Sequence, residues 1–261
     1  NSYIYARRVF ELDVQPADAI VKASADSGYR LYVNGVYVGQ GPAKSGTGWS
    51  FYDSFDIAGL LRKGDNVIAC LAHHIGEDTY SSQAGKPGLL VKVEIVGPEG
   101  RKVIATDETW NARRADDWTS QGIRISKGLG FQEDYDSGLR LDGWTDVKYK
   151  DKDWEPAEVV GIALDKPWGD LIARAVPNLC AEVVYPASVV GLYNSPERPK
   201  DSAAEDIADL MSSGNLSPLK SGSVRGSECL AGPEGQTKVT TPRGNAGVAI
   251  LLDFGREVSG N

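Results

Sequence analysis

The most regular feature of this sequence is an alternation of apolar and polar residues in short runs separated by turn residues. Between residues 20 and 25 the odd-numbered positions are apolar, while the even-numbered ones include Lys22. Residues 88–96 alternate in the same way, with Lys92 and Glu94 on the polar face. A period of two predicts strands with one solvated face. Such strands at intervals of about eight to twelve residues predict an all-β, antiparallel β-sandwich.

The clearest turn signal is Asn34-Gly35, which separates the alternating runs Tyr29–Val33 and Val36–Gly39. Asn-Gly accepts the two positive φ values that a type I′ turn requires. The sequence therefore predicts a tight antiparallel hairpin here.

Composition supports a turn-rich β protein and excludes several partners. The chain has 30 Gly, 13 Pro, 11 Tyr and 6 Trp but a single Met. Its net charge of −8 argues against nucleic acid or an anionic membrane surface as a partner, because both need a basic face. No apolar run approaches the roughly 18 residues of a membrane span, so we expect a soluble protein, either cytoplasmic or periplasmic or secreted. Cys70 lies in an apolar run and is expected to be a free, buried thiol.

Several motifs occur in a fixed order along the chain. They are Y-R-L-Y-V-N-G (29–35), Y-D-S-F-D-I (52–57), T-D-E-T-W-N-A (106–112), E-D-Y-D-S-G-L (133–139), D-G-W-T-D (142–146), D-K-D-W-E-P-A (151–157), L-I-A-R-A-V-P-N-L-C-A-E (171–182) and A-I-L-L-D-F-G-R-E-V-S-G (249–260). This order resembles the N-terminal β-sandwich region of bacterial α-L-rhamnosidases. The chain departs from the family at Ser137-Gly138, where Ala-Arg is more usual, so no role that rests on that arginine is carried over.

The resemblance implies a jelly-roll, galactose-binding-like sandwich followed by part of a second β domain. The expected divisions are a sandwich at 1–165, a connecting segment with the first strands of the next domain at 166–193, a mobile polar insertion at 194–245, and the opening strand of the next β domain at 246–261. A capping box from Ser202 to Glu205, followed by an apolar stripe, predicts one short helix in the insertion.

The resemblance also implies a function. The chain is expected to be the accessory, non-catalytic N-terminal portion of a bacterial glycoside hydrolase that removes terminal L-rhamnose with inversion. In the family the catalytic carboxylates belong to a helical α/α barrel downstream, so no catalytic residue is expected here. The expected partners are a rhamnose-containing carbohydrate and the downstream catalytic domain. Two alternatives stay open: a free-standing, lectin-like carbohydrate-binding module and a purely structural spacer.

A sugar-binding site would pair exposed aromatic rings with polar groups, because sugars place apolar C–H faces on rings. Trp110, Trp144 and Trp154 coincide with strand motifs and are interpreted as core anchors. The run from His73 to Tyr80 reads either as a sugar-facing or calcium-lined loop or as loop scaffolding. The candidate carbohydrate-binding residues are Trp49, Tyr52, Asp53, His73, His74, Glu77, Asp78 and Trp118.

No cofactor is expected, with calcium as the one alternative, since Glu77 and Asp78 could supply two of the several oxygens that it requires. The chain has two histidines and no C-x-x-C pair, so a zinc site is not expected.

Overall fold

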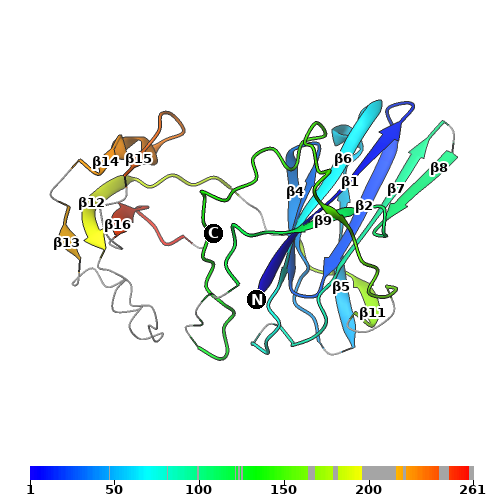
Figure 1. The fold of residues 1–261 in the computed structure, drawn as a ribbon, viewed down its shortest axis with the longest axis horizontal. Helices are drawn as coiled ribbons and strands as arrows, with labels where there is room; N and C mark the ends of the chain where they lie inside the picture. The colour runs from blue at the N-terminus through cyan, green and yellow to red at the C-terminus, as the bar shows by residue number, and fades with distance from the viewer. Residues whose placement is uncertain are drawn as a thin grey trace. The chain divides into compact units, whose positions relative to one another are not determined.

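The computed structural model divides the chain into two compact units, Asn1–Asn178 and Leu179–Asn261. The residues that the structure describes are 1–46, 48–80, 82–98, 100–120, 122, 124, 126–163, 168–178, 182–195, 216–219, 222–240 and 247–258. Strands dominate both units (Figure 1). Within the described ranges, no helix has the length and apolar character needed to cross a membrane.

Two sheets form the first unit. The six-stranded sheet has the order β10-β9-β1-β6-β3-β4 and the five-stranded sheet the order β11-β5-β2-β7-β8. The strands of the six-stranded sheet are β1 (Ser2–Leu12), β3 (Gly28–Val33), β4 (Val36–Gly41), β6 (Gly64–His74), β9 (Asn111–Arg114) and β10 (Glu155–Pro156). Those of the five-stranded sheet are β2 (Asp18–Ala25), β5 (Trp49–Asp56), β7 (Leu89–Gly97), β8 (Gly100–Ala105) and β11 (Asp170–Ala173).

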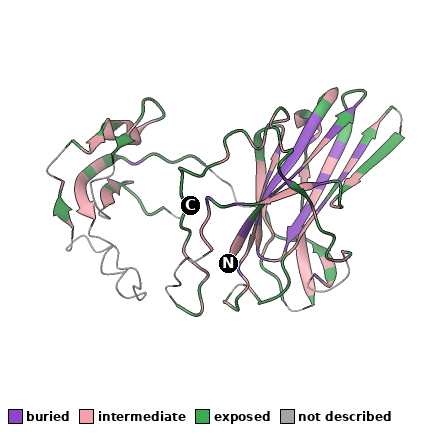
Figure 2. Cartoon of the chain, viewed as in Figure 1, coloured by how far each residue is buried: buried purple, intermediate pink, exposed green. Residues whose placement is uncertain are grey.

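The hydrophobic core lies between these sheets. Val21 and Val93 of the five-stranded sheet pack in one cluster with Leu31 and Ile68 of the six-stranded sheet, and all four side chains are fully buried. Cys70 lies in the same cluster as a free, buried thiol, as predicted. Figure 2 shows buried positions along β1, β2, β6 and β7. Over much of β2 and β7 they alternate with more exposed ones, whereas residues 66–72 of β6 are buried in succession. The predicted all-β sandwich is therefore confirmed.

The predicted hairpin joins β3 to β4. Val33 pairs with Val36, and the two residues between them have positive φ values, 50° at Asn34 and 85° at Gly35. The Asn34 side chain also donates a hydrogen bond to the carbonyl of Leu60 at 2.8 Å. The turn is thus fixed by its own backbone preference and by the neighbouring 3₁₀ turn, η1 (Ala58–Leu60).

A long irregular segment between β9 and β10 covers the outer face of the six-stranded sheet. Tyr3 and Tyr5 of β1 project to this face and form a second buried cluster with Trp154. Trp144 packs against the cluster and is only partly buried. Trp110 lies instead in the main core with 1% of its surface exposed. The packing agrees with the interpretation of Trp110 and Trp154 as core anchors, whereas Trp144 lies at the edge of its cluster.

The sandwich extends beyond residue 165. β11 pairs in parallel with β5, from Asp170 opposite Trp49 to Ala173 opposite Tyr52. Trp168, just before β11, is 1% exposed. Residues 168–174 therefore complete the first unit, although the sequence placed them in a connecting segment. They close one sheet edge and cover one end of the core.

The second unit contains smaller sheets. The three-stranded sheet has the order β13-β12-β16, and a separate hairpin pairs β14 with β15. The elements are β12 (Ser188–Ser195), β13 (Ser217–Pro218), β14 (Val224–Arg225), η3 (Ser227–Ala231), β15 (Lys238–Val239) and β16 (Gly247–Asp253). Short strands thus occur inside the stretch that was expected to be a mobile insertion. The helix predicted after Ser202 lies outside the described residues.

Candidate functional site

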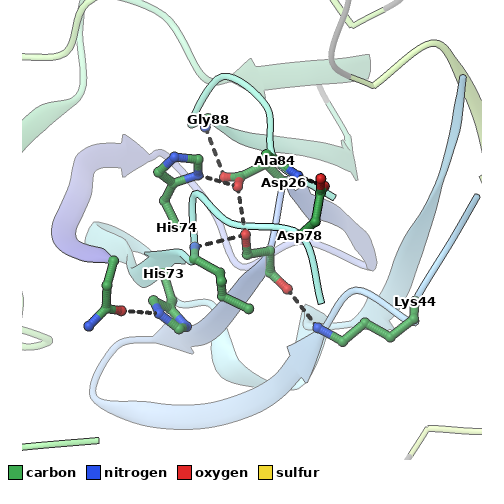
Figure 3. Close-up of polar contacts among 10 residues, drawn as sticks. Asp26, Lys44, His73, His74, Asp78, Ala84 and Gly88 are labelled. Atoms are coloured by element: carbon green, nitrogen blue, oxygen red, sulfur yellow. Dashed lines mark hydrogen bonds and ion pairs between the residues drawn. The ribbon is translucent and has the colours of Figure 1, made fainter. Parts of the chain in front are cut away.

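Asp26 joins three segments at one end of the sandwich. It follows β2, and its Oδ1 accepts a hydrogen bond from the backbone N–H of Gly88 at 3.1 Å. Its Oδ2 lies 2.5 Å from Nδ1 of His74 and accepts a 2.7 Å hydrogen bond from the Ser27 hydroxyl. A carboxylate only accepts hydrogen bonds, so His74 carries a proton on Nδ1. Figure 3 shows the Asp26 carboxylate at the centre of these contacts.

Ser27 and Lys44 extend this network. The Ser27 hydroxyl accepts a hydrogen bond from the backbone N–H of Ile75 at 3.0 Å. The backbone carbonyl of Ser27 accepts a hydrogen bond from Nζ of Lys44 at 3.2 Å (Figure 3). Desolvation lowers the pKa of Lys44, and the nearby Asp26 carboxylate partly opposes that shift. Lys44 thus places its Nζ, a hydrogen-bond donor, near the Asp26 carboxylate.

A cavity of about 680 Å³ opens next to this network. Its walls come from residues 42–46, 48, 50 and 82–86, together with Asp26, Ser27 and Trp168. Two polar atoms of the lining, Nε1 of Trp168 and Oγ of Ser82, are buried without a hydrogen-bond partner. Buried donors are normally paired, so these two atoms have unused hydrogen-bonding capacity. The volume falls within the range of pockets that hold small molecules.

The structure brings only part of the predicted site to this cavity. His74 reaches it through Asp26, and Asp78 reaches it through Ala84, a lining residue whose backbone N–H donates to Oδ1 of Asp78 at 2.8 Å (Figure 3). The side chain of Glu77 lies 3.5 Å from the guanidinium of Arg124.

His73 faces the opposite way from His74, because successive side chains of a strand alternate between faces. Its ring stacks on Tyr3 with centroids 4.0 Å apart and an angle of 1° between the planes. Its Nε2 lies 2.8 Å from Oδ1 of Asn1. Burial, with nearby positive charges as a smaller cause, lowers the pKa of His73 to about 4. This side chain therefore belongs to the outer face of the six-stranded sheet.

Residues of β5 are distributed over different environments. Asp53 points into the sandwich with no exposed surface, where it accepts a 2.5 Å hydrogen bond from Tyr29 and pairs with Arg174 at 2.9 Å. The ring of Tyr52 lies under Nζ of Lys22, 5.6 Å away. Trp49 contacts Phe51 edge to face at 4.9 Å. The structure thus gives Asp53 a buried ion pair and does not place it in the cavity wall.

Trp118 lies on the outer face of the six-stranded sheet, away from the Asp26 network. It stacks on Tyr3 at 4.9 Å and contacts Tyr135 at 4.8 Å.

Calcium binding by Glu77 and Asp78 stays a prediction. No group of three or more His, Cys, Asp or Glu side chains that could hold a metal ion occurs among the described residues. Glu77 and Asp78 have the partners given above, and calcium would need several oxygens at one point.

Comparison with known proteins decides the family. A family model described as the α-L-rhamnosidase N-terminal domain matches residues 14–180. The chain belongs to this family. The resemblance inferred from the sequence motifs is thus confirmed, and a comparison with curated proteins found no match.

Solved α-L-rhamnosidases show how much of such an enzyme the chain represents. A GH78 family rhamnosidase from Bacillus sp. GL1 is 35% identical over 77% of this chain and 21% of its own, with a TM-score of 0.71. The α-L-rhamnosidase from Dictyoglumus thermophilum is 20% identical over 74% of this chain and 22% of its own, with a TM-score of 0.58. The α-L-rhamnosidase from Aspergillus terreus is 21% identical over 76% of this chain and 26% of its own, with a TM-score of 0.54. At these identities the last two show the fold alone. The chain spans about a fifth to a quarter of each enzyme.

Sequence reasoning missed several cavity residues of this α-L-rhamnosidase N-terminal domain. Asp26 and Ser27 stand at a short turn between two strands, which is a detectable position for a site residue. Ser82 and Lys44 lie in loops with no distinguishing sequence pattern. The ring of Trp168 packs against Gly88, which lies about 80 residues earlier in the chain. Only the fold brings these residues together.

Proposed function

We propose that this domain is the accessory, non-catalytic part of a glycoside hydrolase that removes terminal L-rhamnose, and that the cavity beside Asp26 binds carbohydrate. The likeness to the Bacillus rhamnosidase, of which the chain spans 21%, supports the first statement. The unpaired donors of Ser82 and Trp168 in the cavity wall support the second.

The chemistry of the cavity suits binding better than hydrolysis. A glycosidase needs two carboxyl groups on opposite sides of the scissile bond. Asp26 is the one carboxylate among the described lining residues, and it already accepts hydrogen bonds from Ser27 and Gly88 and pairs with His74. Lys44, Ser82 and Trp168 carry three donors that suit sugar hydroxyl oxygens.

Titration of the purified chain with L-rhamnose tests the proposal. In ¹H–¹⁵N spectra the indole N–H signal of Trp168 should shift and saturate. Lys44→Ala should weaken binding about tenfold or more, because a charge-assisted hydrogen bond contributes about 1.5–3 kcal/mol. Lys63→Ala, an exposed lysine of the turn before β6, should leave the affinity unchanged. An unmoved Trp168 signal would show that the cavity does not bind this sugar.

The same chain should not hydrolyse p-nitrophenyl α-L-rhamnoside. Turnover that disappears when one of its own acidic residues is replaced would overturn the non-catalytic assignment.

A further inference from the structure

We propose that this domain has a second carbohydrate site, for a neutral pyranose ring, in an aromatic pocket on the outer face of the six-stranded sheet. It is separate from the cavity beside Asp26 and does not depend on the function proposed for that cavity. The pocket has a volume of about 380 Å³, and its walls include Arg30, Tyr32, Trp118, Arg140 and Trp144.

The strand pattern builds the floor of this pocket. Along β3, Leu31 and Val33 are fully buried in the core, so the alternating residues Arg30 and Tyr32 project to the outer face. Tyr5 of β1 reaches the same face, and its hydroxyl donates a 2.6 Å hydrogen bond to the buried carboxylate of Asp117. The floor is therefore rigid and carries two aromatic rings.

The segment between β9 and β10 supplies the walls, in green in Figure 1. Trp144 contacts Tyr5 at 4.4 Å and meets Tyr32 edge to face at 5.5 Å. On the other side, Trp118 contacts Tyr135 at 4.8 Å. These mutual contacts fix the ring orientations before a ligand arrives, which lowers the entropic cost of binding.

The rings stay accessible although they are well packed. Tyr135 is 41% exposed, and Trp118 and Trp144 are only partly buried. Tyr3 stacks on Trp118, and the Arg30 guanidinium lies 5.6 Å from the centre of the same ring. The open aromatic surface therefore comes mainly from Tyr135 and Trp144. Partly exposed, rigid aromatic faces are what the apolar C–H face of a pyranose packs against.

The charges at the pocket favour a neutral ligand over an acidic one. Arg30 lies 3.7 Å from Glu133, and Arg140 pairs with Asp142 at 2.7 Å. Asp117 behind Tyr5 adds a third carboxylate, so the two cations are at least matched and the pocket has no excess positive charge for an acidic ligand. Among the lining residues, Arg30 and Arg140 can donate to sugar hydroxyl oxygens, and the Asp142 carboxylate can accept from sugar hydroxyl groups.

The test follows each site by its own indole N–H signal in ¹H–¹⁵N spectra of the full chain, with the signals assigned from single Trp→Phe variants. The chain is titrated with the methyl glycosides of L-rhamnose, D-glucose and D-galactose and, as a charged counterpart, with D-galacturonate. We expect at least one neutral glycoside to shift Trp118 and Trp144 together and to saturate, with D-galacturonate binding more weakly. Trp168 reports the cavity beside Asp26 in the same experiment, so failure at one site is distinguished from failure at the other.

Exposed residues provide variants that should not disturb folding. Tyr135→Ala should weaken binding roughly threefold to tenfold, as expected for loss of one aromatic contact, and Arg140→Ala should weaken it as well. Tyr185→Ala and Arg101→Ala are matched controls, because Tyr185 is 42% exposed and the Arg101 side chain, at 58%, equals that of Arg140.

Three outcomes would overturn the proposal. The first is that no saccharide moves the Trp118 and Trp144 signals, and the second is that D-galacturonate binds more tightly than every neutral glycoside. The third is that these signals shift with protein concentration in the absence of sugar, which would indicate that a second copy of the chain occupies the pocket.

Discussion

At the scale of single residues, buried polar groups hold the ends of the sandwich in place. Asp53 receives a hydrogen bond from Tyr29 and an ion pair from Arg174 while its own side chain is fully buried. Burial, together with the hydrogen bond to Asp53, raises the pKa of the Tyr29 hydroxyl, which therefore stays protonated and donates. A buried carboxylate is tolerated when its partners replace the lost hydration. Asp53 thus has a structural role, because it connects β5 to Tyr29 of β3 and to Arg174 after β11.

His73 makes stability depend on pH. Its pKa is about 4 in the folded protein and close to 6.5 in the unfolded chain, so between these values the unfolded state binds more protons. Stability should be highest above pH 6.5, fall as the pH drops to 4, and level off below. Partial exposure screens the shift, so we expect this residue to contribute roughly 1–2 kcal/mol of the loss. Urea unfolding at a series of pH values measures it.

The matched variant is His73→Phe, which keeps a ring stacked on Tyr3 and removes the titrating group. It should lose this part of the pH dependence, and an unchanged profile would assign the effect to other groups.

At the scale of elements, the β3–β4 hairpin depends on Asn34 more than on Gly35. The Asn34 side chain donates to Leu60 and to Asn66 and accepts from the backbone N–H of Val67. Asn34→Ala should therefore reduce the free energy of unfolding by about 3 kcal/mol, since three hydrogen bonds are lost and their partners stay buried. Gly35→Ala should cost about 1 kcal/mol, mainly from the positive φ, because the carboxylate of the exposed Asp146, 3.1 Å from the added Cβ, can move away.

Chemical denaturation of both variants gives the comparison. Val36→Ala, at a position that is 48% exposed, serves as the control and should change stability by no more than about 0.5 kcal/mol. A Gly35 variant less stable than the Asn34 variant would show that backbone conformation, and not the side-chain network, fixes the turn.

The elements also show which features local sequence can predict. The hairpin was predictable because Asn34-Gly35 encodes its own turn geometry, and β2, β3 and β7 because their side chains largely alternate. β6 was recognisable from its continuous apolar run around Cys70 instead. β11 was not predictable, since four residues around Leu171 carry no period and pair with a strand about 120 positions earlier. The site was predictable in part: the loop after β6 was found, whereas alternation sends His73 and His74 to opposite faces and Asp53 into the interior.

At the scale of the whole molecule, the first unit should fold without the second. Both of its hydrophobic clusters consist of residues at or before 157. A chain ending at Asn178 should unfold in one cooperative transition. Tryptophan fluorescence measured during urea denaturation monitors this transition. A chain ending at residue 165 should be less stable by about 3–5 kcal/mol, because it lacks Trp168 and leaves Asp53 buried without Arg174.

The longer chain with Arg174→Ala separates the two causes. Its free energy of unfolding should lie between those of the chains ending at residues 165 and 178, since it keeps Trp168 and β11 but lacks the ion pair. Equal stability of the chains ending at 165 and 178 would mean that β11 does not contribute to the sandwich.

The late position of β11 also has a consequence during synthesis on the ribosome. Asp53 and Arg174 are 121 residues apart, so at about 5–20 residues per second the carboxylate is made roughly 6–24 s before its cation. Until then the nascent sandwich exposes the free edge of β5, which can pair with another chain. Translation speed across residues 54–174 therefore sets how long newly made molecules are open to misassembly, and a chaperone that covers this edge would act in that interval.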